Sequence, residues 1–320
     1  MGNCIWIDLR LSTINLGKVH FTFLLIWGVN TILLTQNVAF TGGHWFNGEE
    51  FLPKTTFYIK DGVFAKQRPA RVDTTIDLTG QYIVPPFTEA HTHNLSSTYG
   101  LKQTIDQYLS EGTFYVQVLG CSDAGRKEVA NLINRPKSVD AAYTNGGITS
   151  TLGHPFLIYE PLAMRLYGPQ QRLEKHDEII SSRLAHRDAY WFFDSQKDVD
   201  NNWETLLETA PNAIKIMLID AENQEGHMSD VTRIGKRGLH PKVAAYVVHK
   251  AHSAGLKVYA HIATPADFRI GLDIGVDVFA HMPGYVYGGQ GNEKEFTLTP
   301  YDFQKAKAKG VVITPTAHLA

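Results

Sequence analysis

The chain has 320 residues, enough for one barrel-sized domain and a small second domain. Hydrophobic residues make up 43% and charged residues 19%, a globular balance that excludes a fully disordered chain. The formal net charge of −2 leaves no basic surplus for binding a phosphate backbone, so nucleic acid is not an expected partner. The two cysteines, Cys4 and Cys121, cannot build a disulfide framework.

The N-terminal segment, residues 1–35, contains an apolar run at 21–34 that Asn30 interrupts. A run of this length is short for a membrane span and matches the core of a signal peptide, although no clean cleavage site follows it. We therefore expect no stable membrane span. A signal peptide predicts a periplasmic or secreted protein, whereas a buried strand pair in its place predicts a cytoplasmic one.

Residues 36–85 are predicted to form a small β-sandwich module. Short β-rich runs alternate there with turn signals, of which the Asn-Gly pair at 47–48 and the Asp-Gly pair at 61–62 are the strongest.

From residue 86 to residue 320, strand-like runs alternate with helical stretches, which is typical of a parallel sheet. The alternation and the length favour an α/β fold, a (β/α)₈ barrel of the TIM type. We predict strands at 87–90, 114–119, 147–152, 213–219, 257–261, 276–281 and 311–315. We predict helices at 101–110, 126–133, 241–254, 265–272 and 300–309, of which the last three open on proline.

Only seven strands are visible, whereas a closed barrel of this type needs eight. The sequence therefore indicates a barrel that lacks strand eight and the C-terminal part of the protein. The long segment 153–212 gives no clear pattern. We expect its acidic residues to lie in a solvated polar loop: Asp194, Asp198 and Asp200.

The sharpest chemical signal is the His-Thr-His run that contains His91 and His93 at the end of the first barrel strand. Residues two apart on a strand point to the same side, so both imidazoles converge. Active sites of such barrels lie at the carboxyl ends of the strands. Two loop histidines are the alternative for an isolated motif, but the barrel pattern that follows favours a metal site.

A lysine and two further histidines lie on later strands. Lys215 falls inside the apolar run NAIKIMLID, where a lone ammonium is costly to bury. It either extends out of the strand end or is an amine of lowered pKa that reacts with CO₂ to form a carbamate. The runs KVYAH and VDVFAH end at His261 and His281, and consecutive parallel strands bring both to the same rim.

Four histidines and one lysine on four strands resemble the metal-dependent amidohydrolase superfamily, over most of the chain from about residue 36. The run IKDGVFAKQRPARVDTTIDLTGQYIVPPFTEAHTHN is similar to that superfamily's passage from a small β-sandwich into the first barrel strand. The IKI run and the paired strand-end histidines most resemble the prolidase-like and imidazolonepropionase-like branches.

The resemblance implies a binuclear site, with His91 and His93 on the first metal and His261 and His281 on the second. It implies that Lys215, carboxylated by CO₂, bridges the two. These branches hydrolyse amide and cyclic amide C–N bonds of small molecules, with a metal-bound hydroxide as the nucleophile and a second metal that polarises the carbonyl. Two zinc ions suit these ligands, and manganese or iron also fits.

The chain departs from the family pattern in three places. Pro86 stands where glycine is usual and Glu89 where aspartate is common, and neither position is a metal ligand. No residue matches the strand-eight aspartate, which binds the first metal and moves a proton to the leaving amine. We therefore expect the catalytic aspartate beyond Ala320, and poor activity of this chain alone.

Three further residues are candidates for substrate binding: His154, Tyr285 and His318. Two other functions stay open. A mononuclear deaminase of the same fold commonly carries a general-acid glutamate after the strand-five histidine, where this chain has only Asp267. An inactive barrel could act as a binding scaffold, but it would not need the five ligand positions. Homo-oligomerisation is also open.

Overall fold

The computed structural model of the protein describes residues 36–284 and 296–315. The fold divides into two compact units. The first holds the described residues up to Phe87 together with 106–114 and 134–139, and the second holds the others. No helix in these described ranges is long and apolar enough to cross a membrane. The segment 1–35, predicted to contain a signal peptide, lies outside them.

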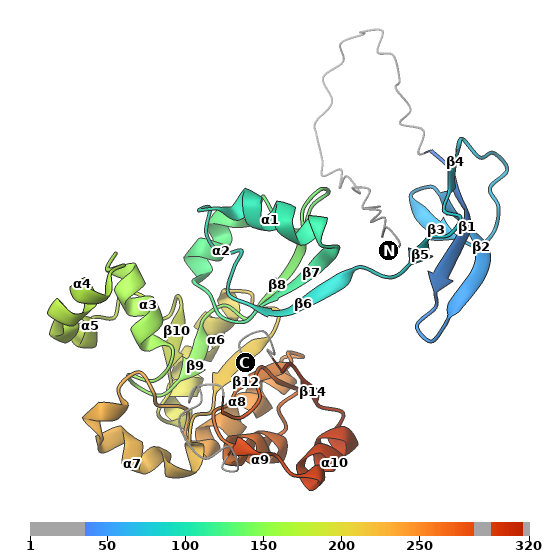
Figure 1. Cartoon of the computed structure of the whole chain (residues 1–320). Helices are drawn as coiled ribbons and strands as arrows, with labels where there is room; N and C mark the ends of the chain where they lie inside the picture. Colours follow the sequence, from blue (N-terminus) through green and yellow to red (C-terminus); the bar gives the residue numbers. More distant parts are fainter. Residues whose placement is uncertain (1–35, 285–295, 316–320) are drawn as a thin grey trace, which may run out of the picture. The chain divides into compact units, whose positions relative to one another are not determined.

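The first unit contains a five-stranded sheet in which β2 pairs with β3 and β1, and β1 pairs with β4 and β5 (Figure 1). The β1–β2 pair is antiparallel, and Phe40, Ile59 and Leu78 form a small buried cluster. The β module is therefore present where it was predicted, but the described residues show one sheet, and a sandwich stays a prediction. The strands are β1 (Val38–Phe46), β2 (Phe51–Lys60), β3 (Val63–Ala65), β4 (Thr74–Asp77) and β5 (Tyr82–Ile83).

The remaining strands form two sheets, in the orders β6-β7-β8 and β10-β9-β11-β12-β13-β14. The pairs along the longer sheet are parallel, which confirms the α/β class. Among the described residues the two sheets are not joined into a closed barrel, so barrel closure stays a prediction. The strands are β6 (Phe87–Thr92), β7 (Thr113–Val118), β8 (Asp140–Tyr143), β9 (Gly147–Thr149), β10 (Tyr190–Phe192), β11 (Ile214–Met217), β12 (Val258–His261), β13 (Val278–Phe279) and β14 (Val312–Ile313).

The helices begin where the sequence supplies caps. In α9 and α10 a threonine cap precedes a proline at the first helical position and an aspartate at the third, which completes a capping box. The predicted helices at 101–110, 241–254, 265–272 and 300–309 are confirmed within two residues. The α-helices are α1 (Leu101–Ser110), α2 (Asp123–Val129), α3 (Phe156–Ala163), α4 (Pro169–Glu174), α5 (His176–Ser181), α6 (Gln196–Glu208), α7 (Gln224–Ser229), α8 (Pro241–Ser253), α9 (Pro265–Ile274) and α10 (Pro300–Lys309).

The structure differs from the sequence prediction mainly in the long segment 153–212. The helices α3, α4 and α5 lie together there (Figure 1). Asp198 and Asp200 belong to α6, so the expectation of a polar loop is wrong for them. Ser195 caps this helix by accepting a hydrogen bond from the Asp198 amide. The strands β8 and β10 were not predicted, and α2 begins three residues earlier than expected.

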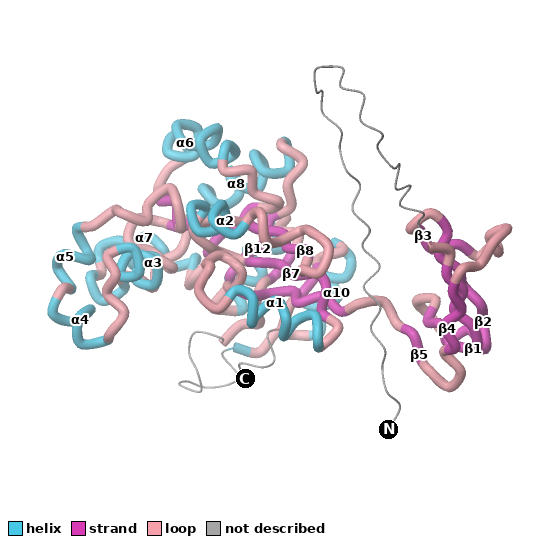
Figure 2. The backbone as a smooth tube through the Cα atoms, turned by 90° about the horizontal axis from the view of Figure 1, so that it is seen from above, coloured by secondary structure: helices cyan, strands magenta, loops and turns pink. Residues whose placement is uncertain are grey.

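The largest apolar core fills the space between the longer sheet and its helices. Strand residues such as Ile216 and Ala260 pack against residues of α8 and α9, such as Val247 and Phe268, all inaccessible to solvent. In Figure 2 the strands of this part lie inside and the helices outside. The strands are thereby held in register, which fixes the positions of the polar side chains at their carboxyl ends.

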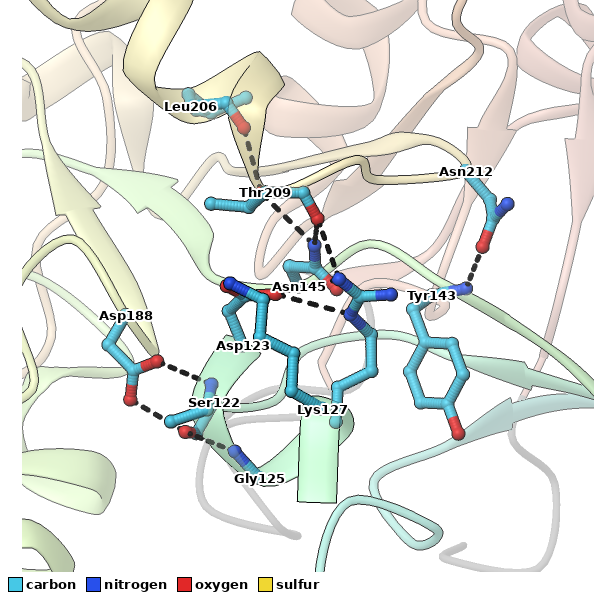
Figure 3. A network of polar contacts seen from close by, with 12 residues as sticks. Ser122, Asp123, Gly125, Lys127, Tyr143, Asn145, Asp188, Leu206, Thr209 and Asn212 are labelled. Atoms are coloured by element: carbon cyan, nitrogen blue, oxygen red, sulfur yellow. Dashed lines mark hydrogen bonds and ion pairs between the residues drawn. The ribbon is translucent and has the colours of Figure 1, made fainter. Parts of the chain in front are cut away.

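A polar network fastens α2 to the loops that follow β8 and α6 (Figure 3). The Asp123 carboxylate pairs with Arg126 at 2.8 Å and with Lys127 at 2.6 Å. The Arg126 guanidinium also donates to the Thr209 carbonyl at 2.9 Å. The Asp188 carboxylate accepts hydrogen bonds from the Ser122 hydroxyl and the Ala124 amide. Each of these charged groups therefore has a partner.

Candidate active site

Five side chains predicted as metal ligands lie at or near the carboxyl ends of four strands in the second unit. Four of them are buried, with exposed fractions between 1% for Lys215 and 8% for His91. The ring centroids of His91 and His281 are 4.6 Å apart, and those of His281 and His261 are 4.8 Å apart. The His93 ring lies 5.2 Å from that of His91. The fold therefore brings the four histidines into one cluster.

Backbone carbonyls fix the orientation of the first two rings. The Nδ1 atom of His91 lies 2.9 Å from the Ala280 carbonyl oxygen, and that of His93 lies 3.1 Å from the Gly120 carbonyl oxygen. Each Nδ1 can then carry the ring proton, which leaves a lone pair on Nε2. The two Nε2 atoms lie 3.3 Å apart. Two lone pairs at this distance are stable only with a cation between them, either a proton or a metal ion.

Lys215 is the buried cationic side chain of the cluster. It lies on β11 between Ile214 and Ile216, and its register neighbour on β12 is Tyr259. Burial lowers its pKa to about 7. Among the described residues no carboxylate pairs with it and no hydrogen bond reaches its ammonium group. At neutral pH a substantial fraction of this amine is therefore unprotonated, the form that acts as a nucleophile.

The histidines around Lys215 are held in the neutral form. Burial, followed by the charges of Lys215 and His91, lowers the pKa of His281 to about 2. The pKa of His261 falls well below its ordinary value for the same main reason, burial. Burial and then Lys215 also lower the pKa of His93, against a smaller opposing effect of the Gly120 carbonyl. Neutral imidazoles are the form that binds divalent metals.

His154, predicted to bind substrate, belongs to the same cluster. Its ring stacks on that of His261, with centroids 4.8 Å apart and an angle of 27° between the planes. Burial, followed by the charge of Lys215, lowers the pKa of His154 to about 4. The other two predicted substrate residues, Tyr285 and His318, lie outside the described residues.

The donor chemistry of the cluster fits a divalent metal, but the donor geometry is incomplete. The oriented Nε2 pair of His91 and His93 and the neutral rings nearby match the preferences of zinc. In the described ranges, however, no group of three or more histidine, cysteine, aspartate or glutamate side chains is arranged to hold a metal ion. The cluster therefore supports a metal site through orientation and protonation state alone.

Sequence reasoning missed a tyrosine at the edge of this cluster. A Cβ atom built on Gly120 would lie 3.4 Å from the Tyr159 hydroxyl oxygen and 3.5 Å from the Cε1 and Nδ1 atoms of His93. Tyr159 lies on α3, five residues after His154. No motif in the sequence marks it, because α3 falls in the segment that gave no clear pattern.

Two cavities border the loop that follows β11. One, of about 390 Å³, is lined by residues that include Asp220, Glu222 and Arg269, and the other, of about 500 Å³, by residues that include Glu222 and His227. Burial raises the pKa of Glu222, and Asp267 and Asp220 raise it further. None of the predicted site residues lines either cavity, so the cavities do not define the site.

Comparisons with known proteins agree on the fold. No protein-family model matches the chain. A solved amidohydrolase structure superposes with a TM-score of 0.61 at 18% identity, over 88% of this chain and 66% of that one. A Xaa-Pro dipeptidase with bound methionine gives a TM-score of 0.60 at 14% identity, over 88% and 67% of the two chains. A prolidase complexed with N-methylphosphonate-L-proline gives 0.58 at 16% identity, over 88% and 66%.

In sequence, an uncharacterised protein of Mycobacterium tuberculosis is 28% identical over 171 residues, which are 48% of this chain and 26% of that protein. A protein of Mycobacterium bovis gives the same values. The chain therefore spans about a quarter of these relatives and 66% of the amidohydrolase structure. At these identities the comparisons establish that the chain shares the fold of solved amidohydrolases and prolidases.

Proposed function

We propose that the protein is a metal-dependent hydrolase of a C–N bond in an amide or cyclic amide. The observation that carries this proposal is the cluster of four histidines, three of them buried, around a buried lysine that has no counter-charge among the described residues. Ordinary structural roles do not account for such a cluster, because burying an uncompensated cation destabilises the fold. The fold shared with solved amidohydrolases and prolidases supports the same conclusion.

His91 and His93 would hold a first divalent cation, and His261 and His281 a second. The Lys215 amine, by attacking CO₂ with loss of a proton, would become a carbamate that bridges the two. Zinc suits imidazole and oxygen donors, and manganese or iron is compatible with them. Bound cations would supply a hydroxide nucleophile at neutral pH and polarise the scissile carbonyl.

The side chains and backbone of this chain prepare the site in three ways. The Ala280 and Gly120 carbonyls hold the Nδ1 atoms of His91 and His93, which directs both Nε2 atoms inward. Burial keeps the imidazoles of His261 and His281 neutral. His154, stacked on His261, offers its ring nitrogens to a substrate at the edge of the cluster.

The names of the solved neighbours indicate the substrate class. They include a prolidase, a Xaa-Pro dipeptidase, a molinate hydrolase and a phenylurea hydrolase. A peptide bond before proline and a phenylurea, which two of these names specify, each contain a carbonyl carbon bonded to nitrogen. We therefore propose a small amide or carbamoyl compound as the substrate, and dipeptides that end in proline are the first compounds to test.

The structure argues against the deaminase alternative. Asp267 is the only acidic residue that could replace the expected glutamate after His261. Its carboxylate accepts backbone hydrogen bonds from Asp220, Ala221 and Ala263, at 2.8 to 3.0 Å. It also accepts one from the Thr264 amide. A fully buried carboxylate whose oxygens accept this many backbone hydrogen bonds positions the surrounding loops, which leaves it no free oxygen directed at a substrate.

The proposal is tested by zinc analysis and by hydrolysis of a panel of Xaa-Pro dipeptides and N-acyl amino acids. We expect about two zinc ions per chain after dialysis, and amide hydrolysis that a chelator abolishes. His93→Ala should lose both zinc and activity. The matched control is His249→Ala, because His249 is an exposed histidine on α8 and should not matter. A protein that binds no zinc and hydrolyses no amide would refute the proposal, and zinc binding without hydrolysis would favour a scaffold.

A further inference from the structure

The Tyr159 hydroxyl and the ring of His93 both approach Gly120. The position that a Gly120 Cβ atom would occupy is 3.4 Å from this hydroxyl and 3.5 Å from His93 Cε1. The hydroxyl and the His93 ring therefore flank the same small space. Gly120 has a φ of +117°, a conformation that favours glycine, and its carbonyl oxygen is the one that orients His93. The same glycine thus lies next to the tyrosine hydroxyl and orients the histidine.

The hydroxyl of Tyr159 has no hydrogen-bond partner among the described residues. Two other tyrosines of the same unit show what a structural tyrosine does here. The Tyr143 hydroxyl donates to the Leu95 carbonyl at 2.8 Å, and the Tyr190 hydroxyl donates to the Glu160 carboxylate. A buried tyrosine hydroxyl normally finds such a partner. Tyr159 therefore differs from them in having a donor that the described protein does not use.

The ring of Tyr159 is nevertheless fixed. It packs against an apolar cluster that includes Phe156, Ile179 and Tyr190. Burial raises the pKa of the hydroxyl, so it keeps its proton at neutral pH. The Nδ1 atom of His93 is already held by the Gly120 carbonyl. A fixed, protonated donor is thus available on the Gly120 side of the His93 ring.

We propose that Tyr159 donates a hydrogen bond to the substrate's carbonyl oxygen as that oxygen becomes an oxyanion during amide hydrolysis. This inference rests on the proposed function. It adds a catalytic residue that neither the sequence motifs nor the metal ligands supply, since the hydroxyl would touch the reacting group. Fixed donors aimed at a developing oxyanion are among the largest contributors to rate in acyl transfer.

The test uses Tyr159→Phe, which removes one oxygen that has no partner in the described protein and should leave the fold intact. Tyr246→Phe is the matched control, because the Tyr246 hydroxyl donates to Asp200 between α8 and α6. Methylphosphonate serves as the probe, since its tetrahedral, anionic oxygens imitate the oxyanion. Its affinity for the zinc-loaded protein is measured by phosphorus NMR titration, together with zinc content and melting temperature.

We expect Tyr159→Phe to weaken methylphosphonate binding about tenfold or more, with unchanged zinc content and melting temperature. For an amide that the wild type hydrolyses, kcat should fall about 10²- to 10³-fold with little change in KM. Tyr246→Phe should match the wild type in both measurements. Wild-type affinity in Tyr159→Phe, or no methylphosphonate binding by the zinc-loaded wild type, would overturn the inference. If the protein still binds zinc and hydrolyses amides, either of these results would leave the proposed function intact. If it does neither, both the proposed function and the role of Tyr159 would be rejected.

Discussion

Two polar regions of the second unit differ in whether their charged side chains have partners. In the network around α2, the charges of Asp123, Arg126 and Asp188 all meet partners of opposite charge or hydrogen-bond donors and acceptors (Figure 3). In the histidine cluster, the buried Lys215 faces neutral rings, and no carboxylate pairs with it among the described residues. The first arrangement stabilises the fold, and the second leaves a site that a ligand must complete.

The comparison predicts opposite effects when a cation is removed from each region. The largest effect is expected for Lys215→Met, which replaces an uncompensated buried amine by an apolar side chain of similar length. We expect the free energy of unfolding of the metal-free protein at pH 7 to rise by about 2–4 kcal/mol. Zinc affinity should fall by more than about 100-fold, since even residues that only orient a ligand contribute 10- to 100-fold.

Urea unfolding and zinc titration measure these two quantities. A Lys215→Met variant that is destabilised and retains zinc would show that the lysine is structural. The comparison between the two regions would then fail.

In the compensated region, Arg126→Met should destabilise the protein by about 2–3 kcal/mol. Among the described residues, the variant leaves the buried Asp123 with the exposed Lys127 as its one charged partner, and it removes a donor from the Thr209 carbonyl. Its zinc binding should equal that of the wild type. Urea unfolding of Arg126→Met and Lys215→Met in parallel compares the two regions directly. If the free energy of unfolding changes in the same direction in both variants, the proposed difference between the regions is wrong.

A third prediction concerns acid stability, through Asp302 at the start of α10. Hydrogen bonds from Arg269 hold the pKa of this carboxyl below its ordinary value, against the opposing effect of burial, and Thr299 lowers it further. A carboxyl whose pKa is lower in the folded state stabilises the fold above its unfolded pKa of about 3.9. That contribution is lost as the pH falls through the folded pKa.

We therefore expect Asp302→Asn to be about 1–2 kcal/mol less stable than the wild type at pH 7. This difference in the free energy of unfolding should decrease steadily below pH 4. Unfolding curves of both proteins at pH 7, 5 and 3 measure the difference. A difference that is constant with pH would show that the charge of Asp302 does not contribute to stability.

The smallest effect is expected at the cap of α2. The Ser122 hydroxyl accepts from the Gly125 amide at 3.0 Å and donates to Asp188. Ser122→Ala should reduce stability by about 1 kcal/mol. Ser122→Thr, which keeps both hydrogen bonds, is the control in the same thermal unfolding experiment. Equal losses in both variants would point to packing instead of capping.

The sequence predicted the elements whose signals are local. Proline at the first helical position with a threonine before it located α9 and α10, and apolar runs that end in histidine located β12 and the end of β13. The resemblance to amidohydrolases supplied the assignment of the metal ligands. That His261 and His281 share one rim followed from these strands, since the carboxyl ends of parallel strands meet there. That step needed only the chain order of the strands.

The elements that the sequence did not predict depend on tertiary contacts, which leave no periodic pattern in the sequence. The strands β8 and β10 are too short to show a period, and the helices α3 to α5 hold together by packing around Phe156. Tyr159 escaped notice for the same reason. Its proposed role rests on the approach of its hydroxyl to Gly120, and no spacing rule relates residues 120 and 159.

The central claim is that the uncompensated cluster is a divalent cation site. The most direct test is a calorimetric titration of the metal-free protein with zinc, in a bicarbonate-containing buffer at pH 7.5. The account predicts about two bound zinc ions, with proton release, and loss of binding in Lys215→Met but not in Arg126→Met. No zinc binding by the wild type, or equal binding by Lys215→Met, would contradict it.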